Sequence, residues 1–247
     1  MINLTFGVNA FIGNARAGKT LSMIREGEQD LLKINEVLYM LKLKIKKGYD
    51  LTELEKKRYK IFSDIEVMSN IKLNKNIFGN YKLISVTDLL EMYKKDIPIK
   101  NKLILFDDIF KNIDSRLSGS EQNRILSYFI TEIGKGRNIM KYVSHFKNRV
   151  DLRLRDFTET FTLCQKGRYY ELNLGNGKML IWLEDENYYQ MEETEKEQKE
   201  MIIKQTTFKE YINYTELYDI ERTKTILDIN FIKAYDYFNH YDTEEIV

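Results

Sequence analysis

Cysteine and proline are nearly absent from this chain of 247 residues, which contains one of each. The single cysteine, Cys164, excludes an internal disulfide and a cysteine-based metal site, and it fits a reducing compartment. Proline occurs only at Pro98, while lysine, asparagine, isoleucine and tyrosine are plentiful, which indicates an AT-rich coding bias. Lysine-rich stretches therefore say little by themselves about binding partners.

Long apolar segments are missing as well. No run approaches the ~18 residues that a membrane-spanning helix needs. Residues 4–8 read as the start of a strand rather than as a basic leader with a cleavage site. We therefore expect a soluble, cytoplasmic protein that is not itself transmembrane.

The chain also lacks a strong excess of charge of either sign, because its 39 lysines and arginines nearly balance its 38 acidic residues, for a net charge of +1. A protein that coats nucleic acid would be more basic, although one local patch would be enough to bind DNA. With 43% hydrophobic residues the chain can bury an ordinary core. Its length suits one large domain, or one domain with an appendage.

Short apolar runs alternate with helical patterns, which predicts an α/β fold with a mainly parallel sheet flanked by helices. Strands are expected over residues 4–12, 65–71, 81–86, 102–106 and 139–143, and a helix over 121–135. After Arg155 the pattern is that of strands, at 157–163, 169–174 and 178–183. The last two are joined at Gly175-Asn176-Gly177, which is typical of a hairpin turn.

The remaining segments read as helices. A first helix is expected from Gly18 to about Gly27, and a helical-hairpin insert over residues 29–63, broken at Lys47-Gly48-Tyr49. Asp50 followed by Glu53 has the spacing of a capping box for the second helix of the hairpin. From Glu192 onward we expect a charged helix and then a helical, tyrosine-rich tail.

One motif identifies a phosphate site. Residues 13–20 match G-x-x-x-x-G-K-[ST] in full, between an expected strand and an expected helix. In such a P-loop the backbone N–H groups face the phosphates, Lys19 reaches the β- and γ-oxygens, and the Thr20 hydroxyl binds Mg²⁺. The nucleotide-binding residues are therefore Gly13, Asn14, Ala15, Arg16, Ala17, Gly18, Lys19 and Thr20.

The second half of such a site is an acid at the end of a buried strand. The apolar run 102–106 is followed at once by Asp107 and Asp108. We expect Asp107 to hold Mg²⁺ together with Thr20, and Asp108 to orient or deprotonate the attacking water. GTP is disfavoured as the nucleotide, because the sequence has no guanine-reading Asn-Lys-x-Asp and no glycine three residues after Asp107.

Several strings resemble Zot-like ATPases, which are named for zonula occludens toxin and belong to the FtsK–HerA group. They are Val67-Met68-Ser69-Asn70-Ile71-Lys72-Leu73, Asp107-Asp108-Ile109-Phe110 with Ile113-Asp114-Ser115-Arg116, Gly136-Arg137-Asn138-Ile139, Tyr142-Val143-Ser144-His145, and Val150-Asp151-Leu152-Arg153-Leu154-Arg155. The resemblance covers roughly residues 3–175. The chain departs from the group at Asp108, where Glu is usual, and at the sensor, where His145 or Ser144 stands in place of Gln.

The resemblance implies a RecA-like P-loop NTPase fold. We assign it to residues 1–190, and we expect a charged helical extension over 191–247, which lies outside the resemblance together with the insert at 29–63. The resemblance also implies a ring-shaped homo-oligomer that hydrolyses ATP with Mg²⁺ to translocate DNA, and we expect duplex DNA in the packaging of a viral or mobile-element genome. The protein would then be located in the host cytoplasm or be associated with the virion. A capsid or membrane protein is expected as docking partner. Two alternatives stay open, namely an assembly or secretion ATPase that acts on protein or single-stranded DNA, and an ATP switch that translocates nothing.

A DNA-translocating ring would need two sets of basic residues, one for the nucleotide of a neighbouring subunit and one for DNA. An arginine from a neighbouring subunit would neutralise charge on the γ-phosphate, with Arg137 as first choice, Arg153 and Arg155 next, and Arg116 last. The DNA contacts would be Lys147, Arg149, Lys166 and Arg168, which flank expected strand ends.

Overall fold

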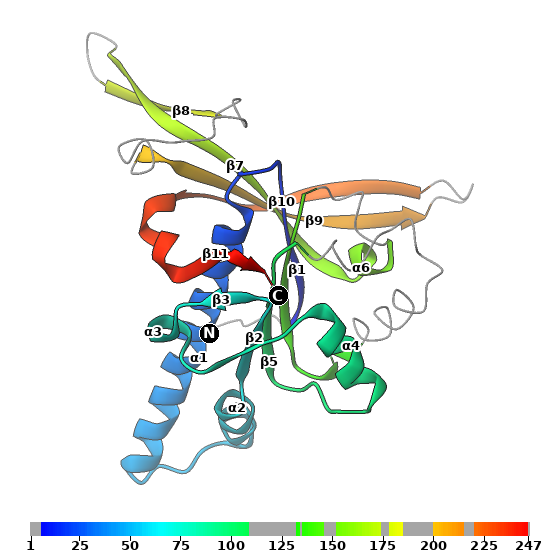
Figure 1. Cartoon of the computed structure of the whole chain (residues 1–247). Helices are drawn as coiled ribbons and strands as arrows, with labels where there is room; N and C mark the ends of the chain where they lie inside the picture. The colour runs from blue at the N-terminus through cyan, green and yellow to red at the C-terminus, as the bar shows by residue number, and fades with distance from the viewer. Residues whose placement is uncertain are drawn as a thin grey trace.

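The computed structural model describes residues 6–108, 132–133, 135–145, 152–173, 178–184, 200–214 and 220–246. In this part of the chain the strands form one nine-stranded sheet and a separate two-stranded one. The order across the large sheet is β10-β9-β7-β1-β6-β5-β2-β4, and β8 also pairs with β7. Figure 1 shows the long strands β7, β9 and β10 at one side of the sheet and the shorter strands at the other.

The centre of the sheet is parallel, as the sequence predicts. It consists of β1 (Gly7–Ile12), β2 (Glu66–Ser69), β4 (Tyr81–Leu83), β5 (Lys102–Phe106), β6 (Ile139–Ser144) and the first part of β7 (Thr158–Asn173). Antiparallel strands β8 (Lys178–Glu184), β9 (Ile202–Tyr214) and β10 (Ile220–Lys233) extend it beyond β7. A mainly parallel sheet with helices on both faces and a P-loop after its first strand confirms the predicted RecA-like P-loop fold.

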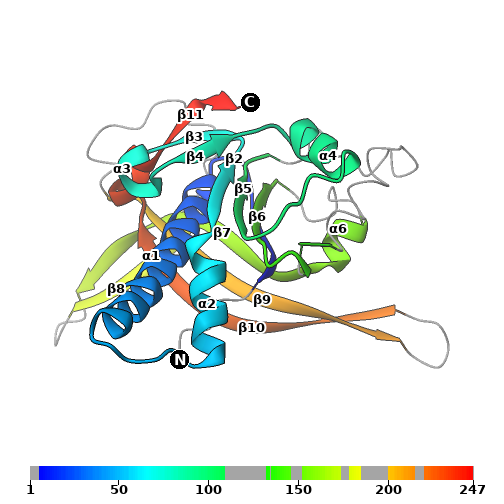
Figure 2. The same cartoon turned by 90° about the horizontal axis from the view of Figure 1, so that it is seen from below.

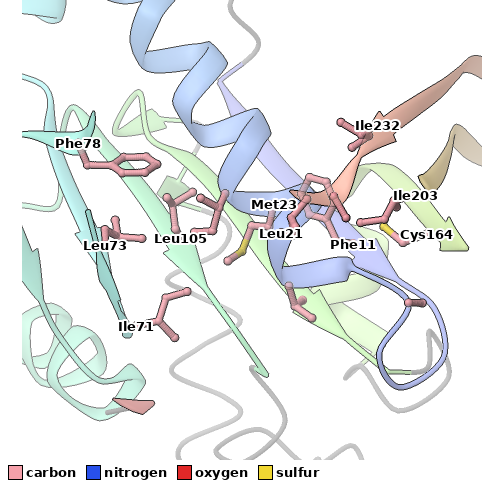
Figure 3. Close-up of a cluster of buried hydrophobic side chains, with 14 of the residues drawn as sticks. Phe11, Leu21, Met23, Ile71, Leu73, Phe78, Leu105, Cys164, Ile203 and Ile232 are labelled. Carbon is pink, nitrogen blue, oxygen red and sulfur yellow. The ribbon is translucent and has the colours of Figure 1, made fainter. Parts of the chain in front are cut away.

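Burial on both faces explains why the central strands are continuous apolar runs. In β5, Ile104 and Phe106 pack into one cluster, while Leu103 and Leu105 pack into the other. Helices α4 (Val86–Lys94) and α6 (Leu152–Asp156) lie on the first face, where Met92 and Leu154 join the core. Figure 3 shows the second cluster, which the start of α1 covers.

Helix α1 is one continuous helix, Lys19–Lys46, so the expected end near Gly27 is wrong. Gly27 lets α1 pack closely on β5, because a Cβ there would lie 2.9 Å from the Leu105 side chain. The predicted break at Lys47-Gly48-Tyr49 is confirmed, and α2 (Glu53–Ser63) follows it and packs back on α1. The capping box is formed by Thr52 and Glu55, whereas Asp50 and Glu53 were the expected pair.

The expected helical tail is wrong for residues 202–214 and 220–233, which form β9 and β10. The residues of β9 explain this, because β-branched and aromatic side chains favour strands; they include Ile202, Ile203, Thr206, Thr207 and Phe208. A 3-10 helix η4 (Ala234–His240) and strand β11 (Tyr241–Ile246) follow. Strand β11 pairs with β3 (Ile71–Leu73), and Figure 2 shows the two side by side near α3 (Lys75–Phe78).

Other differences concern element bounds. The strand expected over 65–71 is divided into β2 and β3 at Asn70, and the strands expected at 157–163 and 169–174 are one strand, β7. Strands β7 and β8 pair antiparallel, which confirms the hairpin, although its turn lies outside the described residues. Most of the helix expected over 121–135 and the proposed boundary at residue 190 also lie outside them. No helix in the described ranges is long and apolar enough to cross a membrane.

Candidate nucleotide-binding site

The predicted site residues meet at one edge of the parallel sheet. Strand β6 lies between β1 and β5 and runs parallel to both, so the carboxyl ends of the three strands lie together. The P-loop follows β1, Asp107 follows β5, and His145 follows β6. Crevices at the carboxyl ends of parallel strands are where α/β proteins bind ligands.

Residues 13–20 join β1 to α1, in the strand–loop–helix arrangement that the motif requires. Gly18 precedes the helix with a φ of +79°, a left-handed conformation that favours glycine. A Cβ at Gly18 would lie 2.1 Å from the Ile203 side chain, so β9 packs closely against the loop. Arg16 also has a positive φ, and the Asn14 carbonyl accepts a hydrogen bond from the Ala17 N–H, which turns the loop toward the helix.

The side chain of Lys19 is buried beneath the loop, although a lysine at this position of the motif would be expected to face solvent. Its exposed fraction is 5%, because the side chain folds back under the P-loop. Its Nζ donates to the Asn14 carbonyl across 2.6 Å. Burial lowers the pKa of Lys19 below its ordinary value, and the nearby carboxylates of Asp107 and Asp108 oppose that change.

His145 is the second contact of this lysine. Its Nδ1 lies 3.3 Å from Lys19 Nζ. An ammonium group can only donate, so Nδ1 accepts and the ring proton of neutral His145 is on Nε2. The structure thus brings His145 to the phosphate site, whereas Ser144, the alternative sensor, is fully buried at the end of β6.

The helix and the acidic strand are joined by one hydrogen bond. Thr20 Oγ1 donates to Asp107 Oδ1 across 2.9 Å. The same carboxylate oxygen accepts from the Asp108 N–H at 3.0 Å. Asp108 has a φ of +43°, which turns the chain sharply just after β5. Both residues that are expected to hold Mg²⁺ therefore lie in contact.

Burial also affects the acid. It raises the pKa of Asp107 above its ordinary value, and the hydrogen bond from Thr20 opposes this rise. A half-buried carboxylate and a buried ammonium thus lie in one site without being paired directly with each other. Such a site favours a ligand that carries both negative oxygens and a cation, as a nucleotide with a divalent metal does.

The structure describes only some of the other predicted cations. Arg137 is exposed just before β6, at the opposite edge of the sheet from the P-loop, with a φ of +57°. Arg155 lies in α6, and the side chain of Arg153 is not described. Lys166 and Arg168 are half-buried on β7. Arg116, Lys147 and Arg149 lie outside the described residues.

Asn70 is a site residue whose contacts the sequence does not reveal. It follows β2 and has an exposed fraction of 3%. Its amide forms two hydrogen bonds with the backbone of Asp107, one in each direction. Asparagine is common in this chain, and the string that resembles Zot-like ATPases includes Asn70 without assigning it a contact.

Comparisons with known proteins found matches only among solved structures. No protein-family model and no curated protein matches the sequence. Among solved structures, the N-terminal domain of zonular occludens toxin from Neisseria meningitidis has a TM-score of 0.44 at 12% identity, covering 97% of this chain and 100% of that one.

A second group of similar structures comes from a virus. The genome packaging NTPase B204 from Sulfolobus turreted icosahedral virus 2, in complex with ATP-gammaS, has a TM-score of 0.37 at 7% identity, covering 90% of this chain and 98% of that one. Its complex with AMP gives a TM-score of 0.38 at 8% identity over the same shares. At such identities a likeness in fold does not transfer a function from one protein to another. Solved structures similar to this chain therefore include proteins of both kinds that its motifs resemble, a Zot domain and a viral genome-packaging NTPase.

Proposed function

We propose that this protein binds ATP with Mg²⁺ at the P-loop, hydrolyses it, and uses the hydrolysis to move DNA. The observation that carries the proposal is the contact between Thr20 Oγ1 and Asp107 Oδ1, with Lys19 in the same loop. This contact joins the phosphate-binding half of the site to the acidic half. ATP rather than GTP is the nucleotide because the sequence contains no guanine-reading motif.

The residues present fit Mg²⁺. This cation takes oxygen ligands, and in nucleotide sites one or two protein side chains and the phosphates supply them. Thr20 would offer its hydroxyl oxygen and Asp107 a carboxylate oxygen. When bound, the metal neutralises charge on the phosphate oxygens. The desolvated carboxylate of Asp107 gives this cation a counter-charge that water does not screen well.

The phosphates themselves would be held by the loop and by Lys19. The N-terminus of α1 provides backbone N–H groups and the positive end of a helix dipole. Lys19 is already buried, and its contacts are a carbonyl and an imidazole. Phosphate oxygens would give this cation the full counter-charge that it lacks.

Asp108 is the proposed acid for hydrolysis. It directly follows the metal-binding Asp107, and its backbone N–H is fixed by the Asp107 carboxylate. That position suits a group that orients or deprotonates the attacking water. His145, which contacts Lys19, lies where a polar side chain can respond to the γ-phosphate.

A shared site between subunits is a further part of the proposal. Arg137 lies before β6 and His145 follows it, so Asn138 and the six residues of β6 separate them. The strand alone spans ~20 Å, too far for Arg137 to reach the phosphates of its own subunit. In a ring-shaped homo-oligomer an exposed arginine at this edge would act on the nucleotide of a neighbour.

A mixing experiment tests this arrangement. Arg137→Ala subunits and Lys19→Ala subunits should each be inactive alone and should regain partial ATPase activity when mixed, since each repairs a different half of the shared site. Mixed rings that remain inactive would exclude Arg137 as the residue that acts between subunits. Full activity of a strictly monomeric protein would exclude the shared site altogether.

Stimulation of ATP turnover by DNA tests the substrate. Duplex DNA should raise the turnover rate more than single-stranded DNA does, and binding should weaken steeply with salt because phosphate contacts release counterions. Lys166 and Arg168 are the described candidates for those contacts. Stimulation by single-stranded DNA alone would favour an assembly or secretion ATPase, and slow turnover that no DNA stimulates would favour an ATP switch. Lys19→Ala serves as the inactive control in each arm.

A further inference from the structure

Two buried asparagine side chains hold strand β5, one at each end. At the amino end, Asn138 Oδ1 accepts from the Lys102 N–H at 2.9 Å, and its Nδ2 donates to the Ile99 carbonyl at 2.7 Å. At the carboxyl end, Asn70 Oδ1 accepts from the Asp107 N–H, and its Nδ2 donates to the Asp107 carbonyl, both at 2.7 Å. The exposed fractions of the two side chains are 1% and 3%.

The need for Asn70 follows from the sheet. The parallel ladder between β2 and β5 ends at the pair Ser69 and Leu105, after which the chain turns into β3. Beyond that pair, β2 has no backbone partner to offer to Asp107. The Asn70 amide has one acceptor and two donors, so it substitutes for a strand and satisfies both backbone groups of Asp107.

Fixing this backbone fixes the acidic half of the site. Asp107 Oδ1 accepts from the Thr20 hydroxyl and from the Asp108 N–H, and both contacts depend on where the Asp107 backbone lies. A rotation of the peptide at Asp107 would move both acidic side chains together.

We propose that Asn70 is a positioning residue that holds Asp107 and Asp108 in place for metal binding and for hydrolysis. It acts through Asp107 and touches neither the nucleotide nor the metal. The proposal rests on the proposed function for its catalytic part. Its metal-binding part can be measured without any hydrolysis.

Asn138 provides a matched control. It is the same residue type, equally buried, and bonded to the backbone of the same strand, but at the end of β5 far from the P-loop. Loss of either amide leaves buried backbone groups unpaired, so Asn70→Ala and Asn138→Ala should both lower thermal stability. Only the change at Asn70 should alter the site.

The first measurement is the affinity for ADP by calorimetry, with and without Mg²⁺. Without Mg²⁺, wild type, Asn70→Ala and Asn138→Ala should bind ADP equally, because the P-loop is intact. With Mg²⁺, the gain in affinity should be lost in Asn70→Ala and kept in Asn138→Ala. An equal gain in all three proteins would overturn the proposal.

The second measurement is ATP turnover. Asn70→Ala should lower kcat by about 10- to 100-fold with little change in KM, as the loss of residues that orient metal ligands commonly does. Asn70→Gln keeps the amide and should recover part of that loss. A kcat in Asn70→Ala that equals that of Asn138→Ala would overturn the catalytic part.

The proposal can still be tested if Asn70→Ala does not fold or if the wild type shows no hydrolysis. If Asn70→Ala does not fold, Asn70→Gln and Asn138→Gln answer the same question, because each keeps its amide and moves it by one methylene. If the wild type hydrolyses no nucleotide, the proposed ATPase function fails. The positioning role is then still supported when the Mg²⁺-dependent gain in ADP affinity disappears in the Asn70 variant alone, and it is refuted when that gain persists.

Discussion

The hydroxyl of Thr20 donates to the carboxylate of Asp107 across 2.9 Å, although the two residues are 87 positions apart in the chain. One lies in the first turn of α1 and the other just after β5. Their contact shows that the fold alone brings the two expected metal ligands together. Binding of a nucleotide would therefore not require the two halves of the site to approach each other.

The two adjacent aspartates should have separable roles. Asp108→Asn should leave ATP binding unchanged and lower hydrolysis by about 10²- to 10⁴-fold, the usual contribution of a general base. Asp107→Asn should instead weaken the dependence on Mg²⁺, since an amide is a poorer ligand for this cation. Nucleotide binding and turnover, each titrated with Mg²⁺, distinguish the two variants. Normal turnover by the Asp108 variant would remove its assigned role.

Two buried lysines should respond differently to the same substitution. Lys141 of β6 is ion-paired with Asp30 and Glu26 of α1, whereas Lys19 contacts a carbonyl and an imidazole. Lys19→Met should abolish ATP binding without lowering the free energy of unfolding of the nucleotide-free protein, because a desolvated cation is removed. Lys141→Met should lower that free energy by about 3 kcal/mol, because it leaves two carboxylates without their partner.

Urea denaturation of the nucleotide-free variants gives both free energies. The comparison is direct, since the exposed fractions of Lys19 and Lys141 are 5% and 4%. A Lys19 variant that is less stable than the Lys141 variant would show that Lys19 supports the fold rather than the ligand.

Gly18 should tolerate substitution much less than Gly48, although the two have nearly equal φ angles of +79° and +77°. A Cβ at Gly48 meets nothing within 4 Å, so Gly48→Ala should cost only about 1 kcal/mol of backbone strain. A Cβ at Gly18 would overlap Ile203, so Gly18→Ala should be clearly less stable and should bind ATP weakly. Thermal melting checks the order, and Gly18→Ala combined with Ile203→Ala should be more stable than an additive effect predicts.

Cys164 should make the protein less stable at high pH. Burial raises the pKa of its thiol to about 12, whereas a thiol in an unfolded chain titrates near ~8.5. The unfolded chain therefore loses this proton first as the pH rises, and stability falls between those two values. From pH 8 to pH 10 the wild type should lose about 2 kcal/mol more than Cys164→Ala does, measured by chemical denaturation at each pH. Equal losses would mean that the thiol ionises as easily in the folded protein.

The phosphate half of the site could be predicted from the sequence because its signals are local. The P-loop motif specifies a turn by its own residues, and the strand expected over 102–106 has the observed bounds because both of its faces are buried. The burial of Lys19 was missed, since a motif gives the type of a residue but not the direction of its side chain. One of the contacts that enclose the Lys19 side chain is made by His145, which lies more than a hundred positions away in the chain.

The features that were missed depend on distant partners. Lys141 lies in an expected apolar strand, and only the position of α1 shows that Asp30 and Glu26 meet it. The prediction of a helix over 202–214 and 220–233 failed because the charged stretch before it suggested a helix, while Ile203 and its neighbours could pair with strand β7. The contacts of Asn70 likewise cannot be predicted until β5 is known to lie beside β2.

The place of β1 in the sheet has a consequence for how the protein is made. Its only partners among the described strands are β6 and β7, with Gly7 opposite Ile139 and Ile12 opposite Leu163. This strand, which is buried on both faces, therefore has nothing to pair with until more than half of the chain has left the ribosome. Pairings at such sequence separation form slowly, because a long loop must close before any contact is gained. During synthesis the strand that leads into the P-loop is thus an unpaired apolar segment, which a chaperone would be expected to hold until β6 and β7 emerge.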